Sequence, residues 1–426
     1  MAVCVAISSE DIIRHPLQID NSKIVPQPTY WNAQNHSEDS YLRAEHWMED
    51  VKECLLPGRH EIVRMNLKSG QAILRYREEL KMFAAIRDEK LNSKSKKSAT
   101  SKKTIQIESM QSPTFLDEHW KTTEAVWPKS PILIAKFNRS AFIKLSVRSP
   151  KDAVFCLLST REIIRERIAA SVAAGCSEIN ELNEDVSAIK WAAWRGLRVS
   201  SGAQAIQLLL RSDRVYVDIL QHELFLQTQP STSKEENATF NLNVIVREFF
   251  EGFHPNWEYR GFVSGGIRTG LTAYNPWILD PQQLANKDRI LELISSVWTQ
   301  VESKIIKISD YSIDFAVAPT CMDGQCWVIE VNAFLPPLAG SGLFSMQSPV
   351  DRNIIKNGPF EFRMRDTAVS ENDFVVTETD HETGRQLKII MQPAPPELMN
   401  IVKKLRRDLK HESSIHSPEK KNCRIC

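Results

Sequence analysis

The stretch from Ser312 to Phe334 constrains the fold most, because it reads as a β-hairpin that carries polar residues in otherwise apolar strands. Side chains alternate along a strand, so Ser312 and Asp314 share one face of the first strand. For the same reason Glu330 and Asn332 share one face of the second strand. Burying an acid or amide without a partner would cost about 2 kcal/mol or more. The hairpin therefore needs partners for these side chains.

A divalent metal ion is one partner that suits these side chains. Two carboxylates and a carboxamide oxygen are ligands of the kind that Mg²⁺ prefers, so Asp314, Glu330 and Asn332 are candidate metal ligands. An odd-length loop centred near Asp323 would place Asp314 opposite Asn332, with Glu330 diagonal on the same face. A two-residue Asp323-Gly324 turn would instead separate the acids. The alternative interpretation is a hairpin whose acids are solvated on an exposed face.

The charge balance excludes a strong overall field. The 54 basic and 53 acidic residues nearly cancel, so the net charge gives no reason to expect nucleic-acid or membrane binding. The apolar start, Met1 to Ser8, is short and lacks the basic residues of a secretory signal, and no apolar run reaches membrane-spanning length. The eight cysteines form no metal-ligand array. We therefore expect a cytoplasmic protein with reduced thiols and no nucleic-acid partner.

The N-terminal part of the chain has the pattern of packing helices followed by a linker. Helical spacing predicts helices over Tyr41–Leu56 and Gly70–Leu91, with Ser69 as the candidate N-cap of the second. The Lys- and Ser-rich segment Asn92–Thr104 has the composition of a solvated linker, which we favour over a nucleic-acid or acidic-surface contact. The predicted regions are an N-terminal helical and irregular region (1–91), a linker (92–104), a main domain (105–365) and a C-terminal extension with a basic tail (366–426).

The main domain begins with mixed α and β patterns. Apolar runs predict strands over Pro131–Lys136 and Ser140–Val147. Lys144 lies within the second strand; a lone strand lysine usually extends to solvent, but the polar turn Arg148–Asp152 and another apolar run follow it at once. Further elements are expected in this order: a helix over Arg161–Ala174 that starts from a capping box at Ser159, helices over Ser177–Arg195 and Gly202–Leu210, and paired strands over Val215–Leu226.

Charged residues lie within the next two predicted strands. The apolar strand 240–250 carries Arg247 and Glu248 near its end. A second hairpin follows, with a glycine pair at its turn, and Glu258 and Arg260 share one face of its first strand. The guanidinium of Arg260 can clamp phosphate oxygens. The alternative is a Glu258–Arg260 charge pair on an exposed face.

These features occur in an order that resembles the ATP-grasp superfamily. More closely, the segments FIKLSVRSPKDAVF, LLLRSDRV, VIVREFF, EYRGFV and WVIEVNAF resemble the cell division cycle protein 123 family. The resemblance covers about residues 140–344. It implies an α+β fold of the ATP-grasp type, in which two α+β subdomains grip a nucleotide between antiparallel sheets.

The resemblance also implies ATP and Mg²⁺ as cofactors. The residues that match nucleotide- or metal-binding positions of the family are Lys144 for the phosphates; Arg247, Glu248 and Phe249 for the adenine; Glu258 and Arg260 for ribose and phosphate; and Asp314, Glu330 and Asn332 for Mg²⁺.

Two positions depart from the family pattern. Glu330-Val331-Asn332-Ala333-Phe334 stands where relatives usually carry Asp-Phe-Asn-Pro-Phe, and it keeps the E-x-N form of the wider superfamily. Thr272-Ala273-Tyr274 stands where relatives carry Ser-Gln-Arg, which removes a phosphate contact. The second departure favours nucleotide binding over turnover, and the sequence identifies no catalytic residue.

Three functions follow from the resemblance as alternatives. Family members bind the gamma subunit of translation initiation factor 2 and promote assembly of its complex, with ATP as a ligand. An ATP-dependent carboxylate-amine ligase acting through an acyl phosphate is the commonest superfamily chemistry. A nucleotide-free scaffold is the third, because fold alone does not fix function.

The C-terminal sequence Lys420–Cys426 has the outline of a prenylation signal. Cys423 lies four residues from the end, and basic residues precede it. One lipid plus a basic patch would give a membrane-anchored fraction. The alternative is an unmodified, solvated tail.

Overall fold

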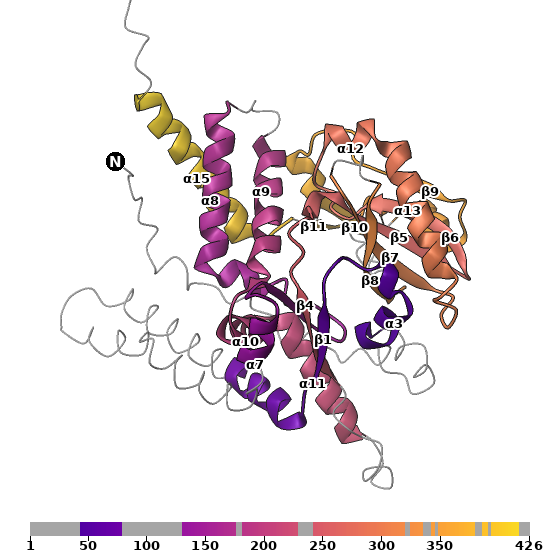
Figure 1. Cartoon of the computed structure of the whole chain (residues 1–426). Coiled ribbons are helices and arrows are strands. Elements are labelled where there is room, and N and C mark those ends of the chain that lie inside the picture. The colour runs from indigo at the N-terminus through magenta and orange to yellow at the C-terminus, as the bar shows by residue number, and fades with distance from the viewer. Residues whose placement is uncertain are drawn as a thin grey trace, which may run out of the picture. The chain divides into compact units, whose positions relative to one another are not determined.

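In a computed structural model the described residues are 43–78, 130–175, 181–228, 242–319, 324–334, 342–345, 348–379, 386–390 and 393–416. The chain forms two compact units. Unit 1 contains 1–39, 58–156 and 197–249, and unit 2 contains 40–57, 157–196 and 250–426. Both units combine helices with a mostly antiparallel sheet (Figure 1), so the α+β prediction is confirmed. The predicted linker and the Cys423 tail lie outside the described residues.

Unit 1 contains a four-stranded antiparallel sheet. Its strand order is β1 (His60–Arg64), β4 (Asn243–Glu248), β2 (Ala141–Leu145), β3 (Arg198–Val199). The middle strands are apolar and buried, as expected for strands covered on both faces. The other elements of the unit are a helix over 67–78, α7 (Ser130–Lys136), the 3₁₀ turn η5 (Ala153–Cys156), α10 (Gly202–Arg211) and α11 (Asp213–Thr228).

Two predicted strands of unit 1 are wrong. Pro131–Lys136 lies in the helix α7, and Val215–Leu226 lies in the helix α11. Short apolar runs fit either state, and the 16-residue length of α11 exceeds that of an ordinary strand. The apolar run after Asp152 forms the 3₁₀ turn η5.

The helices differ from prediction mainly at their starts. The helix over 67–78 begins three residues before Gly70, and Asn66 rather than Ser69 is its cap, because the Ser69 amide donates to Asn66 Oδ1 at 2.8 Å. The predicted Tyr41–Leu56 helix is shorter, as α3 (Ala44–Asp50) and the 3₁₀ turn η4 (Lys52–Cys54) in unit 2. The Ser159 capping box does not start its helix: α8 (Leu158–Ala173) begins earlier, without a side-chain cap.

Unit 2 contains a five-stranded sheet that includes both predicted hairpins. Its order is β8 (Cys326–Ala333), β7 (Tyr311–Val317), β5 (Glu258–Ser264), β6 (Ile267–Ala273), β9 (Glu361–Arg363), and only the β6–β9 pair is parallel. The predicted glycine turn joins β5 to β6, and Gly265 and Gly266 have φ of 57° and 76°. Glycine adopts these left-handed values without the steric cost that a side chain adds, which explains the pair.

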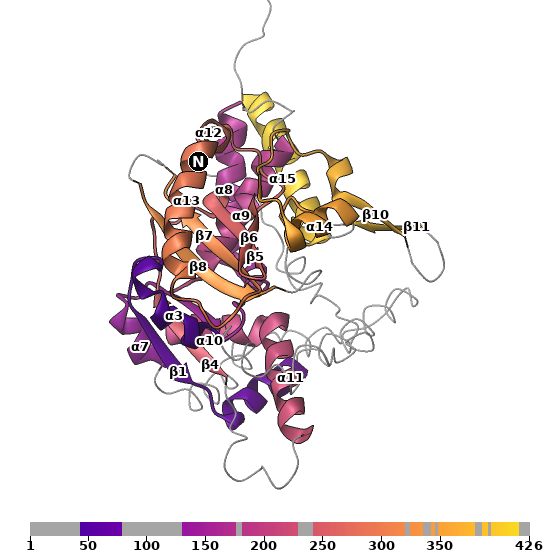
Figure 2. The ribbon, with the colours of Figure 1, turned by 90° about the vertical axis from the view of Figure 1, so that its right-hand side faces the viewer.

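Helices cover both faces of this sheet. On one face α13 (Lys287–Glu302), preceded by the short α12 (Pro281–Ala285), packs against β7 and β8 (Figure 2), and Trp298 of α13 lies 5.3 Å from Phe315 between ring centroids. On the other face α14 (Pro349–Asn357) packs against β5 and β6. Phe262, Phe344 and Ile355 form the buried cluster there. The polar residues of the two hairpins share this second face.

Three helices of unit 2 pack together beside the sheet strands. α8 and α9 (Glu181–Gly196) form a helical hairpin, and α15 (Pro396–His416) packs against α8 (Figures 1 and 2). A short hairpin, β10 (Val375–Thr379) and β11 (Gln386–Ile390), precedes α15. The buried Arg406 of α15 donates from Nε to Asp185 Oδ1 of α9 at 2.7 Å and from Nη1 to Ser171 Oγ of α8 at 3.2 Å. One guanidinium thus joins all three helices.

Among the described residues, no helix is both long enough and apolar enough to cross a membrane.

Gly261 should not tolerate any side chain, because Trp298 fills its face of the sheet. A Cβ added to Gly261 would lie 2.3 Å from Trp298 Cη2. We expect Gly261→Ala to lower the free energy of unfolding by about 1–3 kcal/mol through overpacking. Urea titration of the single and double variants measures this. In combination with Trp298→Phe the loss should be smaller than the sum of the single losses, and simple additivity would contradict the contact.

Candidate functional site

A row of polar residues crosses the five-stranded sheet of unit 2. Arg260 of β5 pairs with Asp314 of β7, and Asp314 pairs with Glu330 of β8. On the other side Arg260 pairs with Thr272 of β6, and Thr272 pairs with Arg363 of β9. Paired residues project from the same face of a sheet. The row therefore carries two acids at one end, a central arginine, and a second arginine at the β9 edge.

The centre of the row is a buried ion pair. Arg260 Nε donates to Asp314 Oδ1 and Arg260 Nη2 donates to Asp314 Oδ2, both at 2.7 Å. The side chain of Asp314 is 0% exposed and that of Arg260 is 8% exposed. Burial lowers the pKa of Arg260, but the charge and hydrogen bonds of Asp314 outweigh it and raise that pKa overall. Arg260 also lies 4.7 Å above the ring of Tyr274, so it stays charged and fixed in place.

The predicted register of the acids is wrong by two residues. Asp314 lies opposite Glu330, and Asn332 lies opposite Ser312, whereas we expected Asp314 opposite Asn332. A β-bulge between Asp314 and Phe315 shifts the later pairs. The shared face of the three predicted ligands is nevertheless correct, since the register differs by two residues. Asn332 Nδ2 lies 3.5 Å from Asp314 Oδ2.

Arg260 provides a charged partner for the Asp314 carboxylate. Glu258, Arg260 and Asp314 are all buried, so the two alternatives that placed these charges on an exposed face are wrong. Glu258 lies two residues along the same face, buried, opposite Ala316. The pairing was missed because β6 separates β5 from β7 in the sequence. Opposite charges on two buried strands were the available signal.

The residues present fit a hydrated Mg²⁺ ion. A carboxylate has about four acceptor positions, so two bonds from Arg260 are compatible with metal ligation by Asp314. Glu330 and Asn332 add oxygen atoms on the same face, and both are only half-buried. Ser312 on that face is fully buried, and its Oγ has no hydrogen-bond partner among the described residues. An unsatisfied buried hydroxyl beside oxygen ligands is consistent with a polar ligand in this place. Asp314, Glu330 and Asn332 would hold the metal.

The site residues of unit 1 divide between the two faces of its sheet. Lys144 of β2 and Arg247 of β4 share one face, since Phe142 pairs with Arg247 and Lys144 pairs with Ile245. Both cationic side chains belong to buried residues. Glu248 projects from the opposite face, where its carboxylate accepts from Arg59 Nε at 3.4 Å. Lys144 and Arg247 therefore form a cationic pair, and Glu248 lies apart from it.

Phe249 follows β4 directly and is buried. Its amide donates to the Ser140 carbonyl at 3.0 Å, which extends the sheet by one bond.

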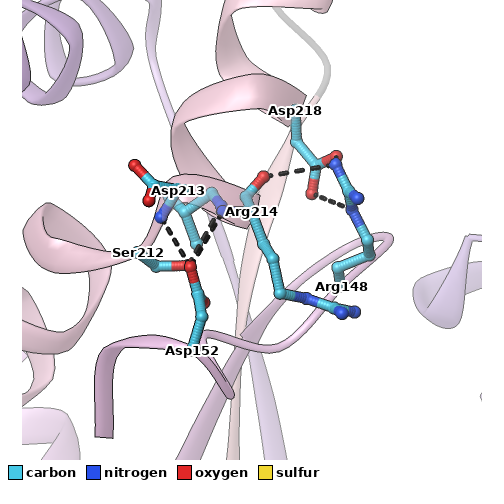
Figure 3. A network of polar contacts seen from close by, with 7 residues as sticks. Arg148, Asp152, Ser212, Asp213, Arg214 and Asp218 are labelled. Atoms are coloured by element: carbon cyan, nitrogen blue, oxygen red, sulfur yellow. Dashed lines mark hydrogen bonds and ion pairs between the residues drawn. The ribbon is translucent and has the colours of Figure 1, made fainter. Parts of the chain in front are cut away.

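The polar turn after Lys144 is fixed to the start of α11 (Figure 3). Asp152 accepts from Ser212 Oγ at 2.6 Å and from the Asp213 amide at 2.7 Å, so it caps the helix. Arg148 Nε donates to both oxygens of Asp218, at 2.8 and 3.1 Å. Burial raises the pKa of Asp218, although the positive charge of Arg148 opposes the rise. The network explains why a charged turn follows a buried strand, and it holds the end of β2 in place.

The structure thus gathers the predicted residues into two groups. Asp314, Glu330, Asn332, Arg260 and Glu258 share one sheet face in unit 2. The remaining predicted residues belong to unit 1, where two cations share a face.

The fold and this site define a class: an α+β protein of two sheet-containing units, one of which carries a buried arginine–carboxylate pair beside a second acid. Within that class, the sequence model of the D123 family matches residues 187–394, just under half of the chain. The resemblance to the cell division cycle protein 123 family is confirmed over this range. The range includes Arg247, the unit 2 site residues and Arg363, and it excludes Lys144.

Solved structures of similar proteins include Cdc123 from Schizosaccharomyces pombe, at 15% identity and a TM-score of 0.45, over 76% of this chain and 95% of that one. A C-terminally truncated form of the same yeast protein matches over the same shares, at 15% identity and a TM-score of 0.44. A search of curated proteins finds no match.

Proposed function

We propose that this protein binds Mg-ATP in the manner of an ATP-grasp protein and acts as an assembly factor for translation initiation factor 2, through its gamma subunit. The observation that carries the nucleotide part is the Asp314–Glu330 pair beside Asn332 on one sheet face. The D123 match over residues 187–394 supports the assembly role.

Each site residue has a physical task in this proposal. Asp314, Glu330 and Asn332 hold the metal, which when bound neutralises phosphate charge. Arg260 holds the Asp314 carboxylate in one orientation through its two parallel bonds. By resemblance, Lys144 is assigned to the phosphates, and Arg247, Glu248 and Phe249 are assigned to the adenine. Glu258 and Arg260 are assigned to ribose and phosphate on the same ground.

Metal binding and nucleotide binding should be linked through the acids. In the wild type Mg²⁺ should raise the affinity for ATP, and in Asp314→Asn/Glu330→Gln it should no longer do so, because neutral oxygens bind hard cations poorly. Glu330→Gln alone leaves the Arg260–Asp314 pair intact, and should weaken the Mg²⁺-dependent affinity by about 10- to 100-fold or more, the range that loss of even a supporting group costs a metal site. Calorimetric titration with and without Mg²⁺ measures both variants.

Glu302→Gln is the matched control for this experiment. Glu302 belongs to α13, on the opposite face of the sheet, where it accepts from Arg268 at 2.6 and 2.7 Å. The Glu302→Gln variant should have the Mg-ATP affinity of the wild type. Unchanged Mg-ATP affinity in the double variant would refute the metal site.

The assembly role and a ligase differ in turnover. With Tyr274 at the position where relatives carry arginine, we expect ADP release to stay near background when purified gamma subunit is added, and a pull-down to retain that subunit. Carboxylates and amines should not stimulate ADP release. An amine-dependent burst of ADP would instead favour the ligase. Failure to retain the gamma subunit would reject the assembly role and leave the nucleotide site to its own test.

A further inference from the structure

Ser312 carries a buried hydroxyl that no described residue hydrogen-bonds. It lies in β7, the strand between β5 and β8, and its relative exposure is 0%. Its Oγ has no partner among the described residues. A hydroxyl buried in this way costs free energy that alanine or valine at the same position would avoid. The residue therefore needs an explanation outside the free chain.

The surroundings of Ser312 point to a ligand of the metal site. Ser312 lies opposite Asn332 on β8 and opposite Phe262 on β5, and it precedes Asp314 by two residues on the same face. Phe262 closes one side, with Phe344 5.9 Å away between ring centroids. The polar neighbours are thus on the Asp314 and Asn332 side. A ligand bound beside Asp314 and Asn332 would therefore lie on the polar side of this hydroxyl.

We propose that Ser312 is a further binding residue of this site, whose hydroxyl bonds to an oxygen of the Mg-ATP complex. The oxygen belongs either to a phosphate, to which Ser312 would donate, or to a metal-bound water, from which its Oγ would accept. No covalent step is involved. The inference rests on the proposed function, because it assigns Ser312 to the same ligand as Asp314, Glu330 and Asn332.

The test compares Ser312→Ala with the wild type in two measurements. Thermal unfolding of the free protein should show an equal or higher midpoint, because the variant removes an unsatisfied buried hydroxyl. Calorimetry should show an affinity for Mg-ATP about 10-fold lower, which corresponds to about 1.4 kcal/mol. A serine with a purely structural role would not combine an equal or higher unfolding midpoint with a lower Mg-ATP affinity.

Thr269→Val is the matched control. The Thr269 hydroxyl is also buried in this sheet, but it donates to the Ile355 carbonyl. This variant should lower the unfolding midpoint and leave the Mg-ATP affinity unchanged.

Two further titrations of Ser312→Ala and wild type identify the oxygen. If the variant also binds ATP more weakly when a chelator removes the metal, the partner is a phosphate oxygen. If the variant binds Mn²⁺ more weakly without nucleotide, as measured by the spin relaxation of Mn²⁺, the partner is a metal-bound water. Either result supports the inference. Equal Mg-ATP affinity in Ser312→Ala and wild type overturns it, and so does a lower unfolding midpoint without a change in affinity. A wild type that binds no Mg-ATP would reject the proposed function itself, which is a distinguishable result.

Discussion

Replacing Asp314 with alanine is expected to lower the free energy of unfolding by about 3–5 kcal/mol, because it leaves the Arg260 guanidinium buried without its counter-charge. The size of the effect follows from the exposures of the two side chains, 0% for Asp314 and 8% for Arg260. Urea unfolding followed by tryptophan fluorescence measures the loss, since Trp298 packs on the opposite face of the same sheet.

A double variant separates the ion pair from the rest of the site. Asp314→Leu with Arg260→Leu removes both charges, and should be less destabilised than Asp314→Ala, because apolar replacement of a whole buried pair is often tolerated. Glu292→Ala is the control: its pair with Arg289 is exposed on α13, so the loss should stay below about 1 kcal/mol. If Asp314→Ala cost no more than this control, the buried pair would not be a stabilising feature.

Replacing Arg406 with alanine should also lower the free energy of unfolding by about 3–5 kcal/mol, because it leaves Asp185 buried among α8, α9 and α15 without its counter-charge. Burial raises the pKa of Asp185, and the Arg406 bond opposes that rise. Without Arg406 the pKa should rise further. A group whose folded pKa is raised binds its proton more tightly in the folded state, so stability recovers as the pH falls through that pKa.

The difference in stability between Arg406→Ala and wild type should therefore be smaller at pH 5 than at pH 8. Chemical unfolding at both pH values measures it. Lys403→Ala provides the control, since Lys403 lies on the same helix in an exposed pair with Glu371. A pH-independent loss would mean that Asp185 is not the residue left uncompensated.

The local part of the fold was predictable because it follows from alternation and turn chemistry. Both hairpins of unit 2 are confirmed, since their strands alternate and glycines occupy the turn at Gly265 and Gly266. The shared face of Asp314, Glu330 and Asn332 follows from the period of two. Their pairing partners did not follow, because packing sets the bulge after Asp314.

The non-local part was not predictable from these patterns. The Arg260–Asp314 pair depends on β7 lying next to β5, an order that alternation does not encode. Apolar runs such as those of α7 and α11 fit a helix as well as a strand, and only packing decides between them. Ser312 lies in the predicted strand, but what distinguishes it from an ordinary serine is its burial without a hydrogen-bond partner in the part of the chain that the structure describes.

During biosynthesis β1 cannot pair with β4 until β4 has been translated. His60 pairs with Arg247 and Arg64 pairs with Asn243, so about 180 residues must leave the ribosome between the two halves of one ladder. At about 5–20 residues per second, the edge strand waits for roughly ten to forty seconds with its amide and carbonyl groups unpaired. The nascent chain thus exposes an unpaired β-strand while those residues are synthesised. We expect ribosome-associated chaperones to engage it during that interval.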